Sequence, residues 1–238
     1  MGEMICAGLA VTRGVFTLRV DELRIAPGEK IALLGENGCG KTTLLQALAG
    51  LLPCGGAITY GGRRWDKLGP QARARHMVYL PQDSGILFNL TVEELIGLAL
   101  ADQPPLAGEA RAAVLAATEM GGFLDRPYHS LSGGEKRRAM LARICCRDAA
   151  LILLDEPTAP LDMRHAGQIM RHLRSGPAAV VAAMHDLNLA TAWFDRFLLM
   201  KQGRILYDVR KDELDPVRLE EVYGLSLRRC GDHFVPGL

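Results

Sequence analysis

The segment GENGCGKT, at residues 35–42, constrains the fold of this chain more than any other feature of its sequence. It matches the pattern G-x-x-x-x-G-K-[ST], follows the apolar run IALL and precedes the helix-like run LLQALAG. In such a strand–loop–helix, glycines let backbone N–H groups close around a β-phosphate. Lys41 would then neutralise the β- and γ-phosphates, and the Thr42 hydroxyl would bind Mg²⁺. The alternative interpretation is a glycine-rich turn beside a core helix.

A pair of carboxylates is predicted at the end of a second buried strand. The run LILL, at residues 151–154, is followed directly by Asp155 and Glu156. Two carboxylates at a strand end are costly unless they hold a cation or transfer a proton. We expect Asp155 to complete the Mg²⁺ shell, and Glu156 to orient and deprotonate an attacking water. A structural ion pair is the alternative.

A second glycine motif, Ser132-Gly133-Gly134, opens a basic segment with the pattern of a helix. A Ser-Gly-Gly turn at a helix start is also a phosphate cradle, because unpaired backbone N–H groups and the positive end of the helix point at the anion. The chain therefore carries two phosphate-binding motifs that lie far apart in the sequence.

The charge balance indicates no polyanionic partner. The formal net charge is +1, so nothing in the composition predicts attraction to nucleic acid or anionic lipid. Three short basic clusters, at residues 63–64, 136–138 and 228–229, are predicted to be solvated surface. We expect no nucleic acid among the partners.

Apolar periodicity predicts an α/β chain whose parallel-sheet core is interrupted by a helical insertion. The middle of the chain, from about Asp83 to Arg147, is rich in Ala, Leu and Glu, with a loop expected at 101–108. Thr91 and Glu94 form a predicted capping box. Strands are expected within 15–20, 30–34, 57–62, 149–157, 178–186 and 196–209, and helices within 91–100, 108–124, 162–176 and 215–224.

The chain has no predicted membrane segment or leader. Its N-terminal stretch lacks a positive region, and no apolar run reaches the roughly 18 residues of a membrane helix. Six cysteines occur without C-x-x-C spacing, which is typical of reduced thiols in the cytoplasm. We therefore expect a cytoplasmic protein that reaches a membrane only through a partner.

Six motifs in this order, GENGCGKT, YLPQD, SLSGGE, LILLDEP, APLD and MHD, resemble those of the ATPase subunit of ABC transporters. The resemblance covers essentially the whole chain. It implies a P-loop NTPase (RecA-like) core with an N-terminal antiparallel β subdomain and an inserted α-helical subdomain. Within this single ATPase domain, 1–238, the core would comprise 1–82 and 148–238, and the helical subdomain 83–147. ATP and Mg²⁺ are the implied cofactors.

The resemblance assigns roles to residues whose individual signals are weak. Gln82 would sense magnesium and contact the membrane partner, and His185 would be the switch histidine. Taken alone, a histidine or glutamine in such a place is more often a structural residue than a functional one. Glu156 would be the catalytic glutamate. Phe16 is our candidate for stacking on adenine, with a plain core residue as the alternative. The implied magnesium ligands are Thr42, Gln82 and Asp155, and the ATP-binding loop comprises Gly35, Glu36, Asn37, Gly38, Cys39, Gly40, Lys41, Thr42 and Thr43.

The resemblance also gives the second glycine motif a use. The signature of one subunit would cap the ATP held by another in a head-to-tail dimer, and hydrolysis would reopen that dimer. The D-loop, ending at Asp162, would lie nearby. The implied signature residues are Ser132, Gly133, Gly134 and Glu135.

The implied partners are a second copy of the chain and a polytopic membrane permease, with a substrate-binding protein acting indirectly. Docking onto the permease would use the region after Gln82, on the inner face of the cell membrane. The run HDLNLA and the C-terminal DELDPVRLEEVYGLSLRR look like importer ATPases for iron–siderophore complexes, haem or vitamin B12. As the transported solute, we expect an iron chelate or haem first and a corrinoid second, with zinc, manganese or another solute after them.

Two other function classes compete with an importer. A small-molecule P-loop kinase would lack the Ser-Gly-Gly signature and His185. A soluble ABC-type ATPase in assembly, repair or translation often carries two cassettes, long arms or basic extensions, and this sequence has none of them. Three residues depart from the family pattern: Glu36 in the phosphate loop, Arg137 where a Gln commonly follows the signature, and Pro160 in the D-loop.

Overall fold

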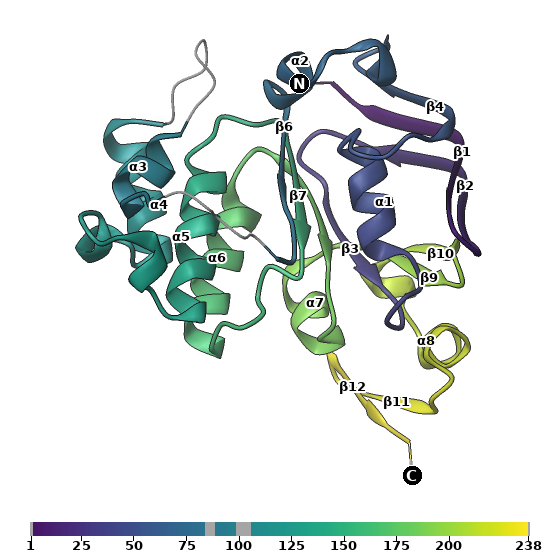
Figure 1. Ribbon diagram of the computed structural model, residues 1–238. Helices are drawn as coiled ribbons and strands as arrows, with labels where there is room; N and C mark the ends of the chain where they lie inside the picture. The colour runs from purple at the N-terminus through teal and green to yellow at the C-terminus, as the bar shows by residue number, and fades with distance from the viewer. Residues whose placement is uncertain (1, 84–88, 99–105, 238) are drawn as a thin grey trace.

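A twisted ten-stranded sheet runs through the computed structural model, which describes residues 2–83, 89–98 and 106–237 (Figure 1). The strand order is β5-β4-β1-β2-β10-β9-β3-β8-β7-β6, and β11 and β12 form a separate hairpin. The strands are β1 Met4–Arg13, β2 Phe16–Ile25, β3 Lys30–Leu34, β4 Gly55–Tyr60, β5 Arg63–Arg64, β6 Met77–Leu80, β7 Leu151–Asp155, β8 Ala179–Ala183, β9 Arg196–Lys201, β10 Arg204–Arg210, β11 Leu227–Cys230 and β12 His233–Pro236. The helices are α1 Lys41–Leu48, α2 Pro70–Ala74, α3 Val92–Gly97, α4 Gly108–Thr118, α5 Gly133–Cys145, α6 Met163–Ser175, α7 Leu187–Trp193 and α8 Pro216–Tyr223.

The sheet is parallel at one end and mainly antiparallel at the other. Strands β6, β7, β8, β3 and β9 pair in parallel, whereas β9 with β10, β2 with β1, and β1 with β4 pair antiparallel. Within the mainly antiparallel region, one parallel bridge between Arg204 and Arg19 joins β10 to β2. Every residue of β3, β7 and β8 is buried, as expected for parallel strands covered on both faces.

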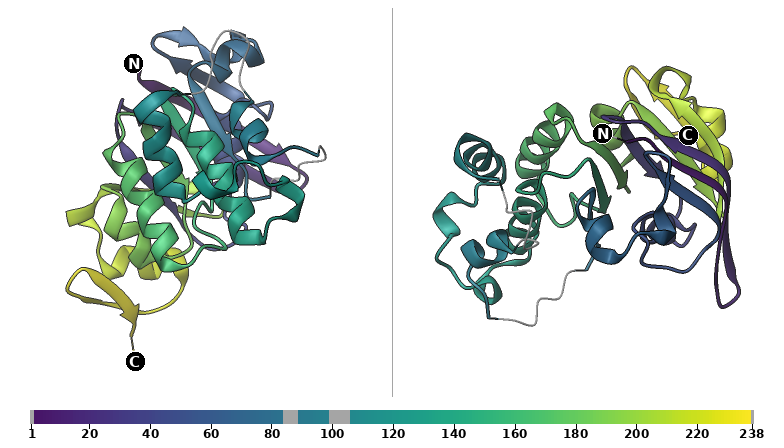
Figure 2. Two further views of the ribbon diagram at one scale, coloured as in Figure 1. Left: turned by 90° about the vertical axis from the view of Figure 1, so that its left-hand side faces the viewer. Right: turned by 90° about the horizontal axis from the view of Figure 1, so that it is seen from above.

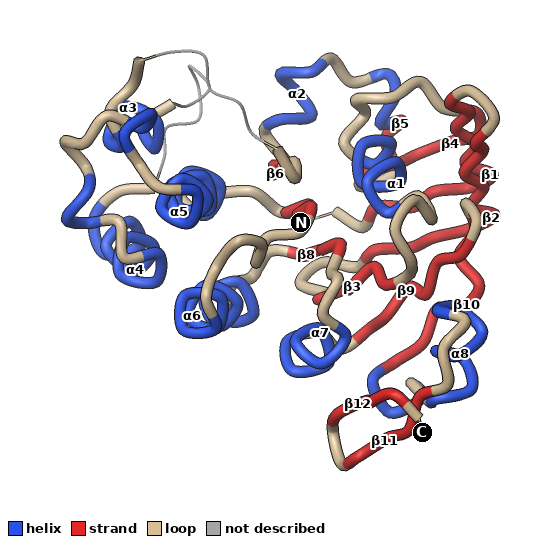
Figure 3. The backbone as a smooth tube through the Cα atoms, turned by 60° about the horizontal axis from the view of Figure 1, so that its bottom comes forward, coloured by secondary structure: helices blue, strands red, loops and turns tan. Residues whose placement is uncertain are grey.

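The alternation of side chains along the central strands separates two hydrophobic cores. Ile31 and Leu33 of β3 belong to the core that holds α1 and the antiparallel strands. Ala32 and Leu34 point the other way, into the core formed with α5, α6 and α7. Figure 3 shows α1 on one side of these strands and α6 and α7 on the other. The carboxyl ends of the parallel strands thus lie between two helical layers.

Helices α3, α4 and α5 pack together beside the sheet, and α4 also contacts α6 (Figures 1 and 2). The capping box that closes the start of α3 is present: Glu94 N–H donates to the Thr91 hydroxyl at 3.1 Å, and Thr91 N–H donates to the Glu94 carboxylate at 2.8 Å. The predicted loop at 101–108 and the predicted docking region after Gln82 lie largely outside the described residues. Helix α2, helix α7 and the β11–β12 hairpin were not predicted from the sequence.

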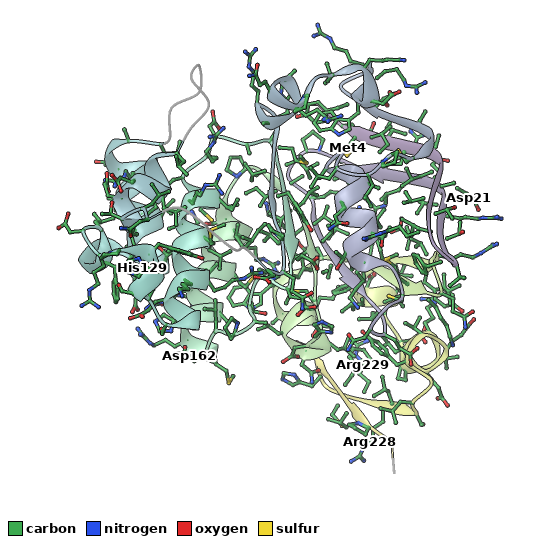
Figure 4. All side chains as sticks on the ribbon, in the orientation of Figure 1. Met4, Asp21, His129, Asp162, Arg228 and Arg229 are labelled. Atoms are coloured by element: carbon green, nitrogen blue, oxygen red, sulfur yellow. The ribbon has the colours of Figure 1, made fainter. Side chains whose placement is uncertain are left out.

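One prediction about the basic clusters is wrong. Residues 63–64 and 228–229 are exposed, the latter on the C-terminal hairpin (Figure 4). Arg137 and Arg138, however, are only 6% and 8% exposed. Helix α5 is enclosed on most of its surface, and both guanidinium groups bind main-chain carbonyl oxygens inside the protein. A cationic side chain can be buried when every N–H finds an acceptor.

Candidate nucleotide-binding site

The glycine loop leaves β3 and turns directly into α1, as its sequence predicts. Gly35 has φ 149°, and a Cβ there would lie 2.2 Å from the Met200 carbonyl oxygen. Gly40, the N-cap of α1, has φ 111°, and a Cβ there would lie 2.9 Å from the Phe16 ring. Only glycine fits these two positions, for both steric and conformational reasons.

Lys41 stands at the first turn of α1 with its ammonium turned into the loop. Its Nζ donates to the carbonyl oxygens of Gly35 at 2.6 Å and Glu36 at 3.1 Å. The first turn of α1 contains no acidic residue, so the positive end of the helix is not neutralised there. The loop thus combines a fixed cation with unpaired helix amides, the arrangement that binds phosphate.

Two contacts from distant parts of the chain hold the loop in place. The Tyr223 hydroxyl, on α8, accepts a hydrogen bond from Gly35 N–H at 3.1 Å. Gly203 N–H, in the β9–β10 turn, donates to the Cys39 carbonyl at 2.9 Å. Burial raises the pKa of Tyr223 to about 12, so the phenol stays neutral beside a phosphate site. Tyr223 was not predicted from the sequence, because a tyrosine near the end of an amphipathic helix is usually a packing residue.

Asp155 is a buried carboxylate at the end of β7, with only 1% of its surface exposed. Burial raises the pKa of Asp155, while a hydrogen bond with the Thr42 side chain lowers it. The Tyr79 hydroxyl donates to Asp155 Oδ2 at 3.5 Å. A carboxylate that is desolvated in this way is strongly favoured to bind a cation.

Glu156 follows Asp155 in the left-handed backbone region, with φ 49°. Its N–H donates to the Ala183 carbonyl at 3.1 Å, which ties it to the neighbouring strand β8. Its carboxylate contacts the imidazole Nε2 of His185, just beyond β8. Because β7 and β8 are adjacent and parallel, two residues 29 positions apart meet at the same edge of the sheet.

A cavity of about 470 Å³ brings most of the predicted site residues together. It contains residues from the phosphate loop, the end of β6, the end of β7 and the end of β8. Its lining is Phe16, Asn37, Gly38, Gly40, Lys41, Thr42, Thr43, Gln82, Glu156 and His185.

The Ser-Gly-Gly motif is not part of this cavity lining. Ser132 is the exposed N-cap of α5, and its hydroxyl accepts a hydrogen bond from Glu135 N–H at 3.4 Å. Ser132 N–H in turn donates to the Glu135 carboxylate at 2.7 Å, so the two residues form a capping box. A Cβ on Gly133 or Gly134 would lie 3.8 Å from Pro160. The motif therefore packs beside the D-loop and presents its helix start to solvent.

Asp162 ends the D-loop as the N-cap of α6. Its carboxylate accepts a hydrogen bond from His165 N–H at 2.9 Å and contacts the imidazole Nδ1 of His165 at 2.8 Å. Figure 4 shows Asp162 at the lower end of the helical region, on the same side of the molecule as α7. This capping role was not predicted from the sequence.

Arg137 reaches from α5 to the carboxyl ends of β6 and β7. Burial lowers the pKa of its guanidinium, and the nearby carboxylates of Asp155 and Glu156 oppose that shift. Its N–H groups donate to five main-chain carbonyl oxygens, those of Pro81, Gln82, Asp155, Glu156 and Pro157. In the sequence, Arg137 stands out only as a departure from the family pattern, and this contact with the strand ends was not predicted.

Among residues 2–83, 89–98 and 106–237, no group of three or more His, Cys, Asp or Glu side chains is arranged to hold a metal ion. In the same part of the chain, no helix has the length and apolar character needed to cross a bilayer. All six cysteines are unpaired.

Comparison with known families gives a consistent result. A family model described as "ABC transporter" matches residues 18–159. The chain is 40% identical to "Hemin import ATP-binding protein HmuV" of Rhizobium meliloti (strain 1021), over 93% of this chain and 88% of that protein. It is 37% identical to the protein of the same name from Pseudomonas entomophila (strain L48), over 92% of each chain.

Solved structures share the same fold. A metal-chelate type ABC transporter in an inward-facing conformation superposes with a TM-score of 0.78 at 22% identity, over 100% of this chain and 98% of that chain. An ATP-binding subunit of an ABC transporter gives a TM-score of 0.78 at 24% identity, over 94% of this chain and 95% of that chain. The predicted α/β fold class is confirmed, and its sheet contains both parallel and antiparallel strand pairs.

Proposed function

The chain belongs to the ABC transporter family of ATP-hydrolysing proteins, and from that premise we propose that it powers the import of haem or another iron chelate. The observation that carries the proposal is the similarity to hemin import ATP-binding proteins from several bacteria, at 36–42% identity. In three of these four relatives the similarity spans at least 92% of this chain.

Hydrolysis would take place in the cavity at the carboxyl ends of the parallel strands. Lys41 and the amides of its loop would bind the β- and γ-phosphates. Thr42, Asp155 and Gln82 would hold Mg²⁺, which prefers a small number of carboxylate or hydroxyl ligands together with nucleotide phosphates. The buried Asp155 carboxylate fits this use because a cation would offset its desolvation. When bound, Mg²⁺ would neutralise charge on the phosphate oxygens.

Glu156 would act as the general base for the attacking water. Glu156 lines the cavity, and the contact of its carboxylate with His185, another lining residue, would hold that carboxylate toward the bound nucleotide. Phe16 lines the cavity beside Gly40 and is the candidate for contact with adenine.

A second copy of the chain would complete the site. Ser132 and Gly133 are exposed and the signature is absent from the cavity lining, while the capping box engages only the amides of Ser132 and Glu135. The amides of Gly133 and Gly134 would therefore serve another molecule. A head-to-tail pair would place each signature over the ATP of the opposite subunit, with Asp162 and its D-loop beside it. Residues 83–147 would move as a helical subdomain relative to a core of 1–82 and 148–238.

The dimer would act on a polytopic permease at the inner face of the cell membrane, and a substrate-binding protein would deliver the solute to that permease. ATP-driven closure and hydrolysis-driven reopening would supply the two states of the transport cycle. A soluble assembly or repair ATPase is the less favoured function, because the relatives are import proteins.

Transport by reconstituted vesicles tests the proposal. The chain is purified with the permease that co-purifies with it, placed in proteoliposomes, and supplied with haem, a ferric siderophore or vitamin B12 on the binding-protein side. We expect ATP-dependent accumulation of haem or the iron chelate, and none when the chain carries Glu156→Gln. Equal ATPase activity with and without every solute, and no accumulation, would contradict an importer.

A further inference from the structure

Arg137 is a buried cation whose hydrogen bonds, within the described residues, all end on main-chain carbonyl oxygens. Only 6% of its surface is exposed, so its desolvation is nearly complete. Burying a guanidinium is costly unless its planar fork of donors is matched by acceptors. Here two clusters of carbonyls from separate strand ends supply that match.

The two carbonyl clusters lie on the segments that carry the proposed catalytic side chains. At the end of β6, Arg137 Nη1 donates to Pro81 O at 2.8 Å and to Gln82 O at 3.3 Å. Beyond β7, Nη2 donates to Glu156 O at 2.7 Å and also contacts Asp155 O. One guanidinium therefore bridges the peptide groups of Gln82 and Glu156, which otherwise belong to different segments.

The Arg137 bridge restrains the direction of the Glu156 side chain. Glu156 has a positive φ, a backbone state that a non-glycine residue adopts only when its surroundings enforce it. Its N–H is held by Ala183 and its carbonyl by Arg137, so both peptide groups around the Glu156 Cα are restrained. Together these two hydrogen bonds favour the orientation in which the carboxylate meets His185 in the cavity.

Arg137 also connects this backbone to the signature. It lies on α5, the helix that Ser132 caps, so a rigid shift of α5 displaces the guanidinium and the Ser-Gly-Gly turn together. We propose that Arg137 is a positioning residue that clamps the main chain of Gln82 and Glu156 to the signature helix, and thereby sets the catalytic geometry of its own ATP site. The proposal rests on the proposed ATPase function.

Steady-state kinetics of Arg137→Met and Arg137→Lys test the clamp. Methionine keeps the length of the stem and removes every donor, whereas lysine keeps the charge but loses the fork. We expect Arg137→Met to lower kcat about 30-fold or more with the KM for ATP changed less than about twofold, because small displacements of catalytic groups cost rate rather than binding. The kcat of Arg137→Lys should lie between that of the wild type and that of the methionine variant.

Arg138→Met is the matched control. Arg138 is the next residue on α5, is equally buried, and donates to the Thr118 and Glu119 carbonyls at the end of α4, at 3.0 Å and 3.3 Å. The Arg138→Met variant should have a lower melting temperature than the wild type, as Arg137→Met does, but its kcat should stay within about twofold of the wild-type value. Equal kcat losses in the two methionine variants would overturn the proposal, since loss of stability alone would explain both. If Arg137→Met does not fold, Arg137→Lys becomes the test. A kcat of Arg137→Lys equal to that of the wild type would then overturn the proposed clamp.

A double-mutant cycle supplies a readout that a purely structural role would not move. If Arg137 acts through the Gln82 segment, the combined kcat loss of Arg137→Met and Gln82→Ala should be several-fold smaller than the product of the single losses. Losses that multiply fully would contradict the clamp. A different result would contradict the proposed ATPase function itself: the wild-type chain would then not hydrolyse ATP, whatever the Arg137 variants do.

Discussion

Glu156 has a left-handed backbone conformation and is held by contacts from three sides. Its carboxylate contacts His185, and its main-chain carbonyl accepts a hydrogen bond from Arg137. Each contact comes from a different element: β8 through Ala183, the segment after β8 through His185, and α5 through Arg137. The side chain is thus oriented before any ligand binds. Such preorganisation is the property that a general base requires.

Replacing Glu156 with Gln preserves the shape of this residue and removes its basicity. We expect kcat for ATP hydrolysis to fall about 100-fold or more, with ATP binding unchanged within about twofold. Phosphate release and binding of a fluorescent ATP analogue measure the two quantities. Glu22→Gln, at an exposed ion pair with Arg24, should leave both unchanged. Wild-type turnover in the Glu156 variant would rule out the general-base role.

How much of the site the sequence predicts depends on the range of each interaction. Asp155 and the phosphate loop are predictable because local spacing places them after apolar strands. The Tyr223–Gly35 hydrogen bond joins residues 188 positions apart and has no local pattern. Arg137 was assigned to the surface cluster at 136–138 because a basic residue in a helix is usually solvated, and only the tertiary structure supplies the carbonyls that bury it.

At the scale of elements, helices α4 and α6 are joined by a cluster of charges around Glu119. This residue ends α4 with φ 52°, and its carboxylate binds the Arg164 guanidinium, with Nη2 at 2.9 Å, and the imidazole Nε2 of His165 at 3.3 Å. His165 in turn contacts Asp162 of the D-loop. The cluster therefore links the predicted helical subdomain to the start of α6.

This link should depend on pH in a defined window. Hydrogen bonds from Arg164 and Gln168 lower the pKa of Glu119 from 4.5 to about 2. A carboxyl group with a lowered folded-state pKa stabilises the fold above its unfolded pKa, and that contribution disappears as the pH falls toward the folded value. We expect Glu119→Gln to melt at a lower temperature than wild type at pH 7, with the difference shrinking below about pH 4.5.

Melting curves between pH 7 and pH 3 measure that difference. Glu220→Gln, an exposed substitution on α8, is the control and should follow the wild type throughout. A Glu119→Gln deficit of the same size at pH 7 and pH 3, or no deficit at pH 7, would exclude the ionised Glu119–Arg164 pair as a stabilising link.

Elements were predictable where their periodicity is strong. The parallel strands and α6 were expected because apolar runs and helical periods are local, and Asp162 starts α6 with a side-chain cap. The β11–β12 hairpin was missed, since three of the four residues of β11 are exposed and show no strand alternation. Asn188 on α7 secures it through hydrogen bonds with Phe234, at 2.8 Å and 3.1 Å.

At the scale of the whole molecule, the two phosphate motifs face different surroundings. Residues 37–38 and 40–43 of the phosphate loop line a cavity with Glu156 and His185, whereas the signature lies outside that lining and against the D-loop. The proposed ATP site and the start of α5 thus lie on separate surfaces of one chain. We propose that ATP closes two copies of this chain by joining these two surfaces.

The mass of the chain in solution tests that claim most directly. The Glu156→Gln chain is measured with and without Mg·ATP, alone and with the added change Ser132→Arg, which blocks the exposed start of α5. We predict that Mg·ATP shifts Glu156→Gln from the 25.9 kDa monomer to twice that mass. The double variant should bind ATP with unchanged affinity and stay monomeric. Dimerisation of the double variant, or weakened ATP binding by its monomer, would contradict the claim.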